Sequence, residues 1–341
     1  MSRGRLRVFL VLVLVLIFAR LLAPSVQRLY HLFRLPFIWP NSSAEAIISQ
    51  QRDHFDVSFS SFPANYSTED AGLTPLIPAR LHHIYLGPNP PHAEWLAARA
   101  DCLKQHGLWE SFLWNDSNAP QFVEENFSHL YDMWTSYPYM VQRVDALRYM
   151  VLQKYGGAVL DIDLACKRSL EPLRQFSFVA PAAHPAGFSI GMMLASPNHP
   201  FVKSLVNSLP MFNHVWPLLS YVTIMFSTGC HYASTVYTLQ KNRSDIRILS
   251  GTPDNPKMHM LNGFVDTPPF PPSWLFLVAQ QRRSSNSYAQ RYRAEDYLTC
   301  LSNGHWNLGP TVLVLPLGAT SFFVTTRRRI QLTMSFPPAF V

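Results

Sequence analysis

The chain has 341 residues, of which 48% are hydrophobic, and a formal net charge of +7. This length and apolar fraction allow one large core or two smaller ones. The positive charge lies at the two ends, with six arginines in residues 1–34 and three in 327–329, and neither segment contains an acidic residue. The remaining residues are slightly acidic overall, which excludes a nucleic-acid-binding surface on the folded part.

An almost wholly apolar stretch runs from Leu6 to Val26, about the ~20 residues that a bilayer span requires. Three arginines precede it, so residues 1–34 are predicted to form a cytosolic tip and a transmembrane signal anchor, with the bulk of the chain in the lumen. A cleaved signal peptide stays the alternative, although Pro24 lies poorly for cleavage after Ala23.

Beyond this segment, the pattern predicts one α/β domain behind a stem. Residues 35–74 show no sustained hydrophobic period and are predicted to be a stem or linker. Residues 75–305 are predicted to form one folded domain with a mixed sheet flanked by helices. In chain order we expect strand 80–86, helix 93–105, strand 111–114, helices 120–131 and 141–155, a strand ending at the acids near 161, strands 176–180 and 189–195, helices 201–209 and 222–239, and strand 246–249.

Two acids close the apolar run Ala158-Val159-Leu160, at Asp161 and Asp163. Alternation along a strand would send both carboxylates to the same face. Hard oxygen ligands of this kind suit Mg²⁺ or Mn²⁺, which complete their shell with water and substrate phosphates. The pair therefore predicts a metal-assisted diphosphate site, although a D-x-D sequence alone is more often a solvated turn or an ion pair.

The helical segment before these acids carries a second charged pair, Asp145 and Arg148, three residues apart and thus on one helix face. Gly156 and Gly157 then end the helix and turn the chain into the acidic strand. The combination of this helix, the glycine pair and D-x-D is far more specific than any one of its parts.

With these residues the chain resembles the sugar-binding D-x-D glycosyltransferases, and within them the fungal inositol-phosphoceramide mannosyltransferases. The resemblance covers roughly residues 75–250. It is carried by Ile77-Pro78 with His82 to Gly87, Trp114-Asn-Asp116, Tyr137-Pro138-Tyr139 leading to Gln142-Arg143-Val-Asp145, and Tyr221 to Gly229.

The resemblance implies a GT-A-like, Rossmann-like nucleotide-sugar-binding fold and retaining transfer of mannose from GDP-mannose to inositol phosphoceramide. It further implies a Golgi membrane location with a luminal catalytic domain, and a regulatory membrane subunit as partner. Asp145, Arg148, Asp161 and Asp163 would be the catalytic residues, with Mn²⁺ or Mg²⁺ held by Asp163 and Asp161. Asp145, Arg148 and Asp161 would also contact the donor, and Tyr85 and Trp114 would wall the nucleotide base, although both aromatics could equally be core.

Two departures from the ceramide-directed pattern leave alternatives open. The Asn-Asp pair that follows G-V-S in those enzymes is replaced here by Ile190-Gly191, and the late S-S-W-H lacks its histidine at Leu275. His305 or His259 is a candidate to take the place of that histidine near the metal, although a lone histidine is more often structural. The alternatives are a mannosyltransferase acting on protein-linked glycans and a non-catalytic Golgi paralogue that binds a partner or a nucleotide sugar.

The remaining signals concern compartment and topology. Five N-x-[ST] sequons and four cysteines agree with a secretory lumen, where the cysteines could form up to two disulfides in three possible pairings. Residues 306–341 are predicted as a possible second transmembrane segment, at 308–326, with a basic tail. A buried strand pair is the alternative for 308–326.

Overall fold

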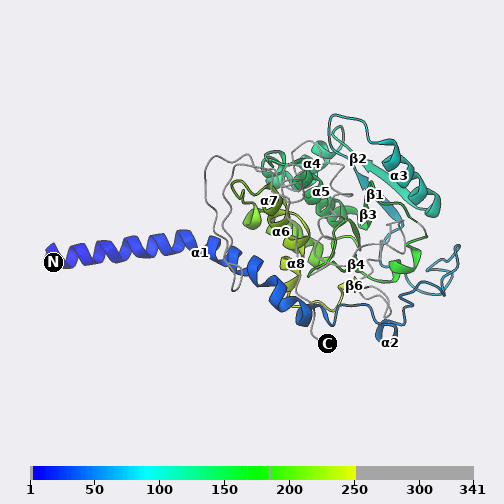
Figure 1. Cartoon of the computed structure of the whole chain (residues 1–341), viewed down its shortest axis with the longest axis horizontal. Helices are drawn as coiled ribbons and strands as arrows, with labels where there is room; N and C mark the ends of the chain where they lie inside the picture. The colour runs from blue at the N-terminus through cyan, green and yellow to red at the C-terminus, as the bar shows by residue number, and fades with distance from the viewer. Residues whose placement is uncertain (1–2, 167, 184–185, 251–341) are drawn as a thin grey trace, which may run out of the picture. The chain divides into compact units, whose positions relative to one another are not determined.

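The computed structural model describes residues 3–166, 168–183 and 186–250 (Figure 1). Their centre is a mixed sheet of six strands in the order β2-β1-β3-β5-β4-β6. The strands are β1 (Arg80–Ile84), β2 (Glu110–Trp114), β3 (Gly157–Asp161), β4 (Phe178–Pro181), β5 (Met192–Ala195) and β6 (Arg247–Leu249). The prediction of an α/β class with a mixed sheet is confirmed.

Parallel pairing brings the ends of three strands to one edge of the sheet. β1 pairs in parallel with both β2 and β3, and Ile84 lies opposite Trp114 on one side and Asp161 on the other. β5 is antiparallel to β3 and β4, while β4 and β6 are parallel. In open α/β sheets the carboxyl ends of parallel strands are where ligands bind, so this edge is the expected place for a site.

Helices flank both faces of this sheet, with α3 on one side and α5, α6 and α8 on the other (Figure 1). The helices are α1 (Arg3–Ser43), α2 (Gln50–Asp53), α3 (Ala93–Gln105), α4 (Ala119–Thr135), α5 (Met140–Tyr155), α6 (Pro200–Phe212), α7 (Ser220–Ser227) and α8 (Cys230–Thr238), with a 3-10 turn at Glu171–Gln175. Two glycines join α5 to β3, and Gly157 has φ of +96°. A Cβ at this glycine would lie 2.6 Å from the Arg80 carbonyl oxygen, so only glycine allows β3 to start this close to β1.

The core on the α3 side includes part of the segment predicted as a stem. Phe55, Phe59 and Ile77 are buried there against strand residues such as Leu81. Ile48 extends the sheet through a backbone hydrogen bond to Ile248, in which its N–H donates at 2.9 Å. The stretch from about residue 46 onward is therefore a packed part of this fold, because its aromatic side chains cover one sheet face.

A disulfide joins Cys102 on α3 to Cys166, just after the acidic turn, across 64 residues of sequence. Sequence spacing left the partner of Cys102 open among the other three cysteines, and in the structure that partner is Cys166. Of the other two cysteines, Cys230 is unpaired in the described part of the chain and Cys300 lies outside it.

Breaking this disulfide is expected to cost about 2–5 kcal/mol in the free energy of unfolding, because the bond closes a long loop in the unfolded chain. The double variant Cys102→Ser/Cys166→Ser should unfold at lower urea concentration than the wild type. Reductant should destabilise the wild type but not the double variant. Equal effects of reductant on both proteins would show that this pair is not bonded in solution.

One predicted helix proved wrong. The expected helix over 222–239 is two helices, α7 and α8, interrupted at Thr228-Gly229. Thr228 leaves helical geometry with φ of −139°, and its backbone carbonyl accepts a hydrogen bond from the Tyr149 hydroxyl at 2.6 Å. The apolar period continues through the break, which is why the sequence pattern did not reveal it.

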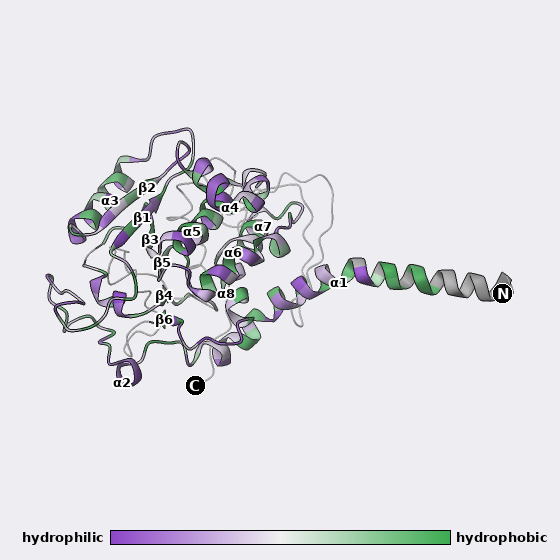
Figure 2. Cartoon of the chain, turned by 180° about the vertical axis from the view of Figure 1, so that it is seen from behind, coloured by the Kyte–Doolittle hydropathy of each residue, from purple (hydrophilic) through white to green (hydrophobic). Residues whose placement is uncertain are grey.

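α1 continues the predicted anchor without interruption to Ser43, and Figure 2 shows its hydrophobic residues in green. Its second half packs on α8, where the Leu32 carbonyl oxygen lies 2.7 Å from His231 Nε2. Within the described residues, no helix meets the combined length and hydropathy expected of a membrane crossing. The anchor therefore stays a prediction. The calls at 306–341 and His305 lie outside the described residues.

Candidate active site

Four charged residues from two neighbouring elements meet at the carboxyl edge of the sheet. Asp145 and Arg148 lie on the buried side of α5, and Asp161 is the last residue of β3, with Asp163 in the turn that follows. The catalytic role predicted for both pairs requires them to be close, and Arg148 of the helix does contact Asp161 of the strand.

Arg148 links the helix to the strand end. Its Nη2 donates to Asp161 Oδ1 at 2.5 Å, and the guanidinium is almost fully buried while the carboxylate is about a quarter exposed. Nε and Nη1 of Arg148 have no hydrogen-bond partner among the described residues. Buried donors without partners are costly, so two of this guanidinium's nitrogens are free to bind oxygens of a ligand.

Asp145 lies fully buried behind this pair. The Thr228 hydroxyl donates to Asp145 Oδ2 at 3.0 Å. Burial raises the pKa of Asp145 to about 7, with the Arg148 charge lowering the pKa and the Asp161 charge raising it. A carboxyl group of this kind can accept hydrogen bonds from sugar hydroxyls once ionised, at a depth that excludes water.

Asp145→Asn is expected to make the ligand-free protein more stable at neutral pH. The folded pKa of Asp145 is raised from 3.8 to about 7, so its contribution to stability is full below pH 3.8 and is lost as the pH rises toward 7. The asparagine variant lacks this loss, which amounts to a few kcal/mol at about 1.4 kcal/mol per pKa unit. Urea unfolding between pH 4 and pH 8 measures the difference.

The matched control is Asp132→Asn, at an exposed carboxylate on α4. This variant should follow the wild-type pH profile throughout. Parallel profiles for Asp145→Asn and the wild type would show instead that Asp145 is already ionised at acidic pH.

Asp163 lies in a turn after the strand and not on the strand itself, as the sequence had predicted for both acids. The strand ends at Asp161, and a turn follows in which the Leu164 N–H donates to the Asp161 carbonyl oxygen at 3.0 Å. The simple alternation argument therefore does not apply to Asp163. Burial raises the pKa of Asp163 well above its usual value, and the charge of Asp161 adds to this effect, so the two carboxylates still lie near each other.

This pair fits a divalent cation on the chemistry of its donors. Two carboxylates repel each other here in a partly buried place, and an added positive charge would offset that repulsion. Mg²⁺ and Mn²⁺ bound together with a diphosphate need only one or two protein carboxylates. Among the described residues, no group of three or more His, Cys, Asp or Glu side chains is arranged to hold a metal.

Gly191 is a site residue that sequence reasoning noted only as a departure. Its carbonyl oxygen accepts the Asp161 N–H at 2.8 Å. A Cβ at this position would lie 2.8 Å from Asp161 Oδ2, so the bare glycine leaves room for that carboxylate. Thr228 was likewise missed as a partner of Asp145, although the segment Tyr221 to Gly229 had been singled out for its resemblance to the family.

The two aromatic residues predicted to bind the nucleotide base lie in different surroundings, one in the core and one at the edge of the sheet. Trp114 is buried, and its ring lies against Phe122, 4.7 Å between centroids, and in a cluster with His82 and Tyr155. Tyr85 follows β1 at the carboxyl edge, is half-buried, and donates its hydroxyl to the Asn89 carbonyl oxygen at 2.7 Å. The structure places Trp114 in the core, and Tyr85 keeps a position compatible with the prediction.

Comparison with known proteins agrees with this geometry. Residues 92–179 match the family described as glycosyltransferase sugar-binding region containing DXD motif. That range holds all four charged residues of the site. The chain is 34% identical over 166 residues to inositol phosphoceramide mannosyltransferase 1 of Schizosaccharomyces pombe, covering 48% of this chain and 51% of the relative.

Two further relatives are similar at the same level. Mannosyl phosphorylinositol ceramide synthase SUR1 of Saccharomyces cerevisiae is 34% identical over 194 residues, which is 55% of this chain and 50% of the relative. Inositol phosphoceramide mannosyltransferase 3 of S. pombe is 32% identical over 182 residues, 53% of this chain and 49% of the relative. The chain thus spans about half the length of the curated relatives that it matches.

Among solved structures, the PaToxG glycosyltransferase is similar with a TM-score of 0.38 and 15% identity, covering 70% of this chain and 84% of that one. A likeness this weak supports no argument about the site. The predicted resemblance to the D-x-D glycosyltransferases and their inositol-phosphoceramide branch is confirmed by the family match and by the relatives.

Proposed function

We propose that this chain, whose residues 92–179 match a glycosyltransferase sugar-binding region, transfers mannose from GDP-mannose to inositol phosphoceramide with retention of configuration and with Mn²⁺ or Mg²⁺. The observation that carries the proposal is the Arg148–Asp161 contact, which joins the helix pair to the D-x-D acids at the sheet edge. The names of the relatives support the choice of sugar and acceptor. The proposed fold type is GT-A.

In the proposed reaction, the bond from the anomeric carbon to the diphosphate oxygen breaks, and a bond to an inositol hydroxyl oxygen forms as that hydroxyl gives its proton to the leaving diphosphate. Negative charge grows on the leaving diphosphate. A divalent cation held by Asp163 and Asp161 would act as a Lewis acid that neutralises this charge.

The residues of the chain position the sugar for this step. Arg148 offers two unpaired nitrogens in a fixed planar fork, which suits binding of sugar or phosphate oxygens. Asp145 accepts hydrogen bonds from sugar hydroxyls, and the Thr228 hydroxyl fixes its orientation. Holding the reacting atoms in one geometry accounts for much of the rate gained in such transfers.

For location and partners, the arginine pattern around the apolar N-terminal run supports a proposed Golgi membrane anchor with a luminal catalytic domain. A regulatory membrane subunit is proposed only by analogy to the resembling enzymes.

The test is a donor and acceptor screen with the purified full chain. Release of GDP from GDP-mannose should require Mn²⁺ or Mg²⁺, and mannose should appear on inositol phosphoceramide. Preferred turnover of a uridine sugar would overturn the proposed donor. Transfer to oligosaccharides in place of the lipid would support the protein-glycan alternative, and donor binding without any turnover would support the non-catalytic one.

A further inference from the structure

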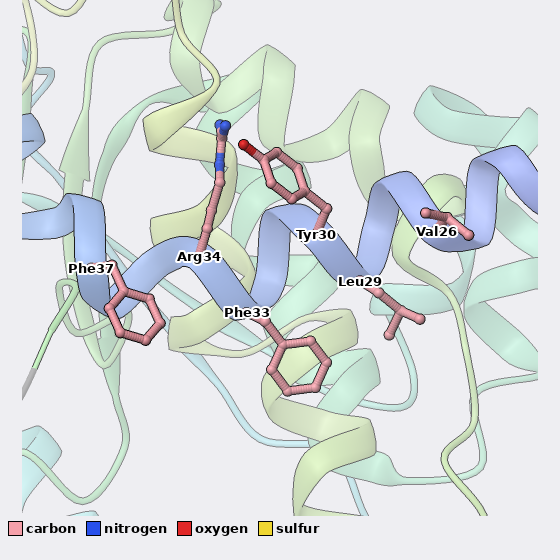
Figure 3. Close-up of a pocket in the computed structure, with 6 residues that line it drawn as sticks. All are labelled: Val26, Leu29, Tyr30, Phe33, Arg34 and Phe37. Carbon is pink, nitrogen blue, oxygen red and sulfur yellow. The ribbon is translucent and has the colours of Figure 1, made fainter.

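α1 carries an apolar side that no other part of the described chain covers. Figure 3 shows residues of this side, with Leu29, Phe33 and Phe37 pointing one way from the helix and Tyr30 and Arg34 pointing the other way. Together with Val26 they line an open hollow of about 480 Å³. Phe37 is 84% exposed. The buried residues of the same helix are Leu32, Leu35 and Trp39, and the Trp39 ring packs on Tyr237 of α8, 5.3 Å between centroids.

A second group of exposed apolar residues lies next to it, between α6 and α7. Leu218 is 95% exposed and has φ of +63°, a left-handed backbone that a leucine adopts at a cost. Two contacts join the helices on either side of this segment, α6 and α7, to α1. The Phe33 and Phe226 rings pack edge to face at 5.9 Å, and Arg28 Nη1 donates to the Met211 carbonyl oxygen at 3.3 Å.

We call the combined surface the α1–α7 face. Its exposed members are Val26, Tyr30, Phe33 and Phe37 of α1 together with Met211, Val215, Leu218, Leu219 and Tyr221. Monomeric soluble proteins rarely expose contiguous apolar patches of this kind unless another surface covers them.

Charge identifies the kind of surface that fits. The sequence has no Asp or Glu in residues 3–44 or in 172–244, which include all of α1, α6, α7 and α8. Apart from Arg3, Arg5 and Arg7 at the far end of α1 and Arg174, which is buried and paired with Glu171, these two segments contain six lysines and arginines. Exposed aromatic and aliphatic side chains among arginines, without a single acid, are typical of an interfacial surface that meets anionic lipid headgroups.

A second copy of the chain fits this face less well. Two copies meeting through it would bring two surfaces of the same positive sign together, which opposes association. A bilayer offers both an apolar layer for the aromatic rings and a negative surface for the arginines.

The α1–α7 face is also close in structure to the candidate active site. α7 ends at Ser227, whose hydroxyl oxygen accepts a hydrogen bond from Gln142 Nε2 at 2.6 Å, and the next residue, Thr228, donates to Asp145. The same short helix therefore belongs to the exposed apolar face at its start and to the site at its end.

We propose that the α1–α7 face lies on a lipid bilayer with anionic headgroups, and that this contact brings the acceptor side of the site to the membrane surface. The second clause rests on the proposed function. The first depends only on the exposed residues and the charge distribution.

Hydrogen exchange on the full chain in lipid nanodiscs tests the docking directly. The readout is the ratio of exchange rates in residues 213–219 between discs of phosphatidylcholine alone and discs with about one third phosphatidylserine. We expect a several-fold slowing by the anionic lipid in the wild type. The double variant Phe37→Ser/Leu218→Ser should show a ratio near one.

The matched control is Leu96→Ser/Leu108→Ser, which removes two exposed leucines on and after α3, outside the α1–α7 face. This control should behave as the wild type. A ratio near one in the wild type would overturn the proposal. Exchange that is slow in both kinds of disc, and that stays slow in the Phe37→Ser/Leu218→Ser variant, would also overturn it. Another part of the chain or a protein partner would then cover residues 213–219.

Metal-dependent release of GDP from GDP-mannose in water needs no lipid surface and separates this proposal from the proposed function. The Phe37→Ser/Leu218→Ser variant should keep the wild-type rate in that assay. A wild type that docks but releases no GDP would contradict the function and leave the docking standing.

Discussion

Asp163→Asn is expected to lower the rate of mannose transfer by roughly a hundred- to a thousandfold while leaving the fold intact, the loss typical when one group that stabilises a growing charge is removed. Burial and the charge of Asp161 raise the pKa of Asp163, so its ionised form costs stability in the ligand-free protein. The asparagine variant should therefore unfold at the same urea concentration as the wild type or a higher one. Steady-state transfer rates and urea unfolding of the same preparation give both numbers.

Asp161→Asn and Asp163→Asn should both lose activity, but they should differ in their stability against unfolding. Asp161 pairs with the buried Arg148, so its removal leaves that guanidinium without a charged partner at 2.5 Å and should destabilise the protein. Asp101→Asn, at an exposed carboxylate on α3, is the control and should change neither quantity. Full activity in Asp163→Asn would remove this residue from the site.

Arg148→Met should be the most destabilising single change in the site, costing about 3–5 kcal/mol, because it leaves buried acid groups without their cation. At about 2–4 °C for each kcal/mol in a domain of this size, the melting temperature should fall by roughly 10 °C. Arg148→Lys keeps the charge but not the planar fork, so it should recover part of the stability and little of the transfer rate.

Lys154→Met on the same helix is the matched control, since Lys154 is exposed and its side chain makes no hydrogen bond or ion pair in the described structure. Its effect should stay within about 0.5 kcal/mol. The double variant Arg148→Met/Asp161→Asn should be less destabilised than the sum of the two single changes. Additive effects would mean that the contact between Arg148 and Asp161 does not form in solution.

Local signals in the sequence were enough to place the elements that build the site. The helix predicted over residues 93–105 has those same bounds in α3, because the helical spacing of apolar residues is a local signal. The approach of Asp145 and Arg148 to Asp161 also followed from local facts, namely helix spacing and a glycine turn into a strand. These predictions needed no knowledge of contacts distant in sequence.

The parts that sequence reasoning missed depend on long-range contacts. Thr228 reaches Asp145 across 83 residues, and its carbonyl oxygen accepts a hydrogen bond from the Tyr149 hydroxyl, 79 residues away. Phe55 and Phe59 read as an irregular stem until the sheet provides a face for them to cover. The pairing of Cys102 with Cys166 likewise requires α3 and the acidic turn to be neighbours, which spacing alone does not reveal.

The central claim is that α5 and the D-x-D acids form one site for a diphosphate and a divalent cation. Electron paramagnetic resonance of Mn²⁺, titrated with the full chain in the presence of GDP, tests it without any acceptor. We expect the wild type with GDP to remove more of the free Mn²⁺ signal than GDP alone removes, and Asp163→Asn to add nothing to the loss that GDP causes. Loss of the signal to the same extent in both proteins, or no loss in either, would contradict it.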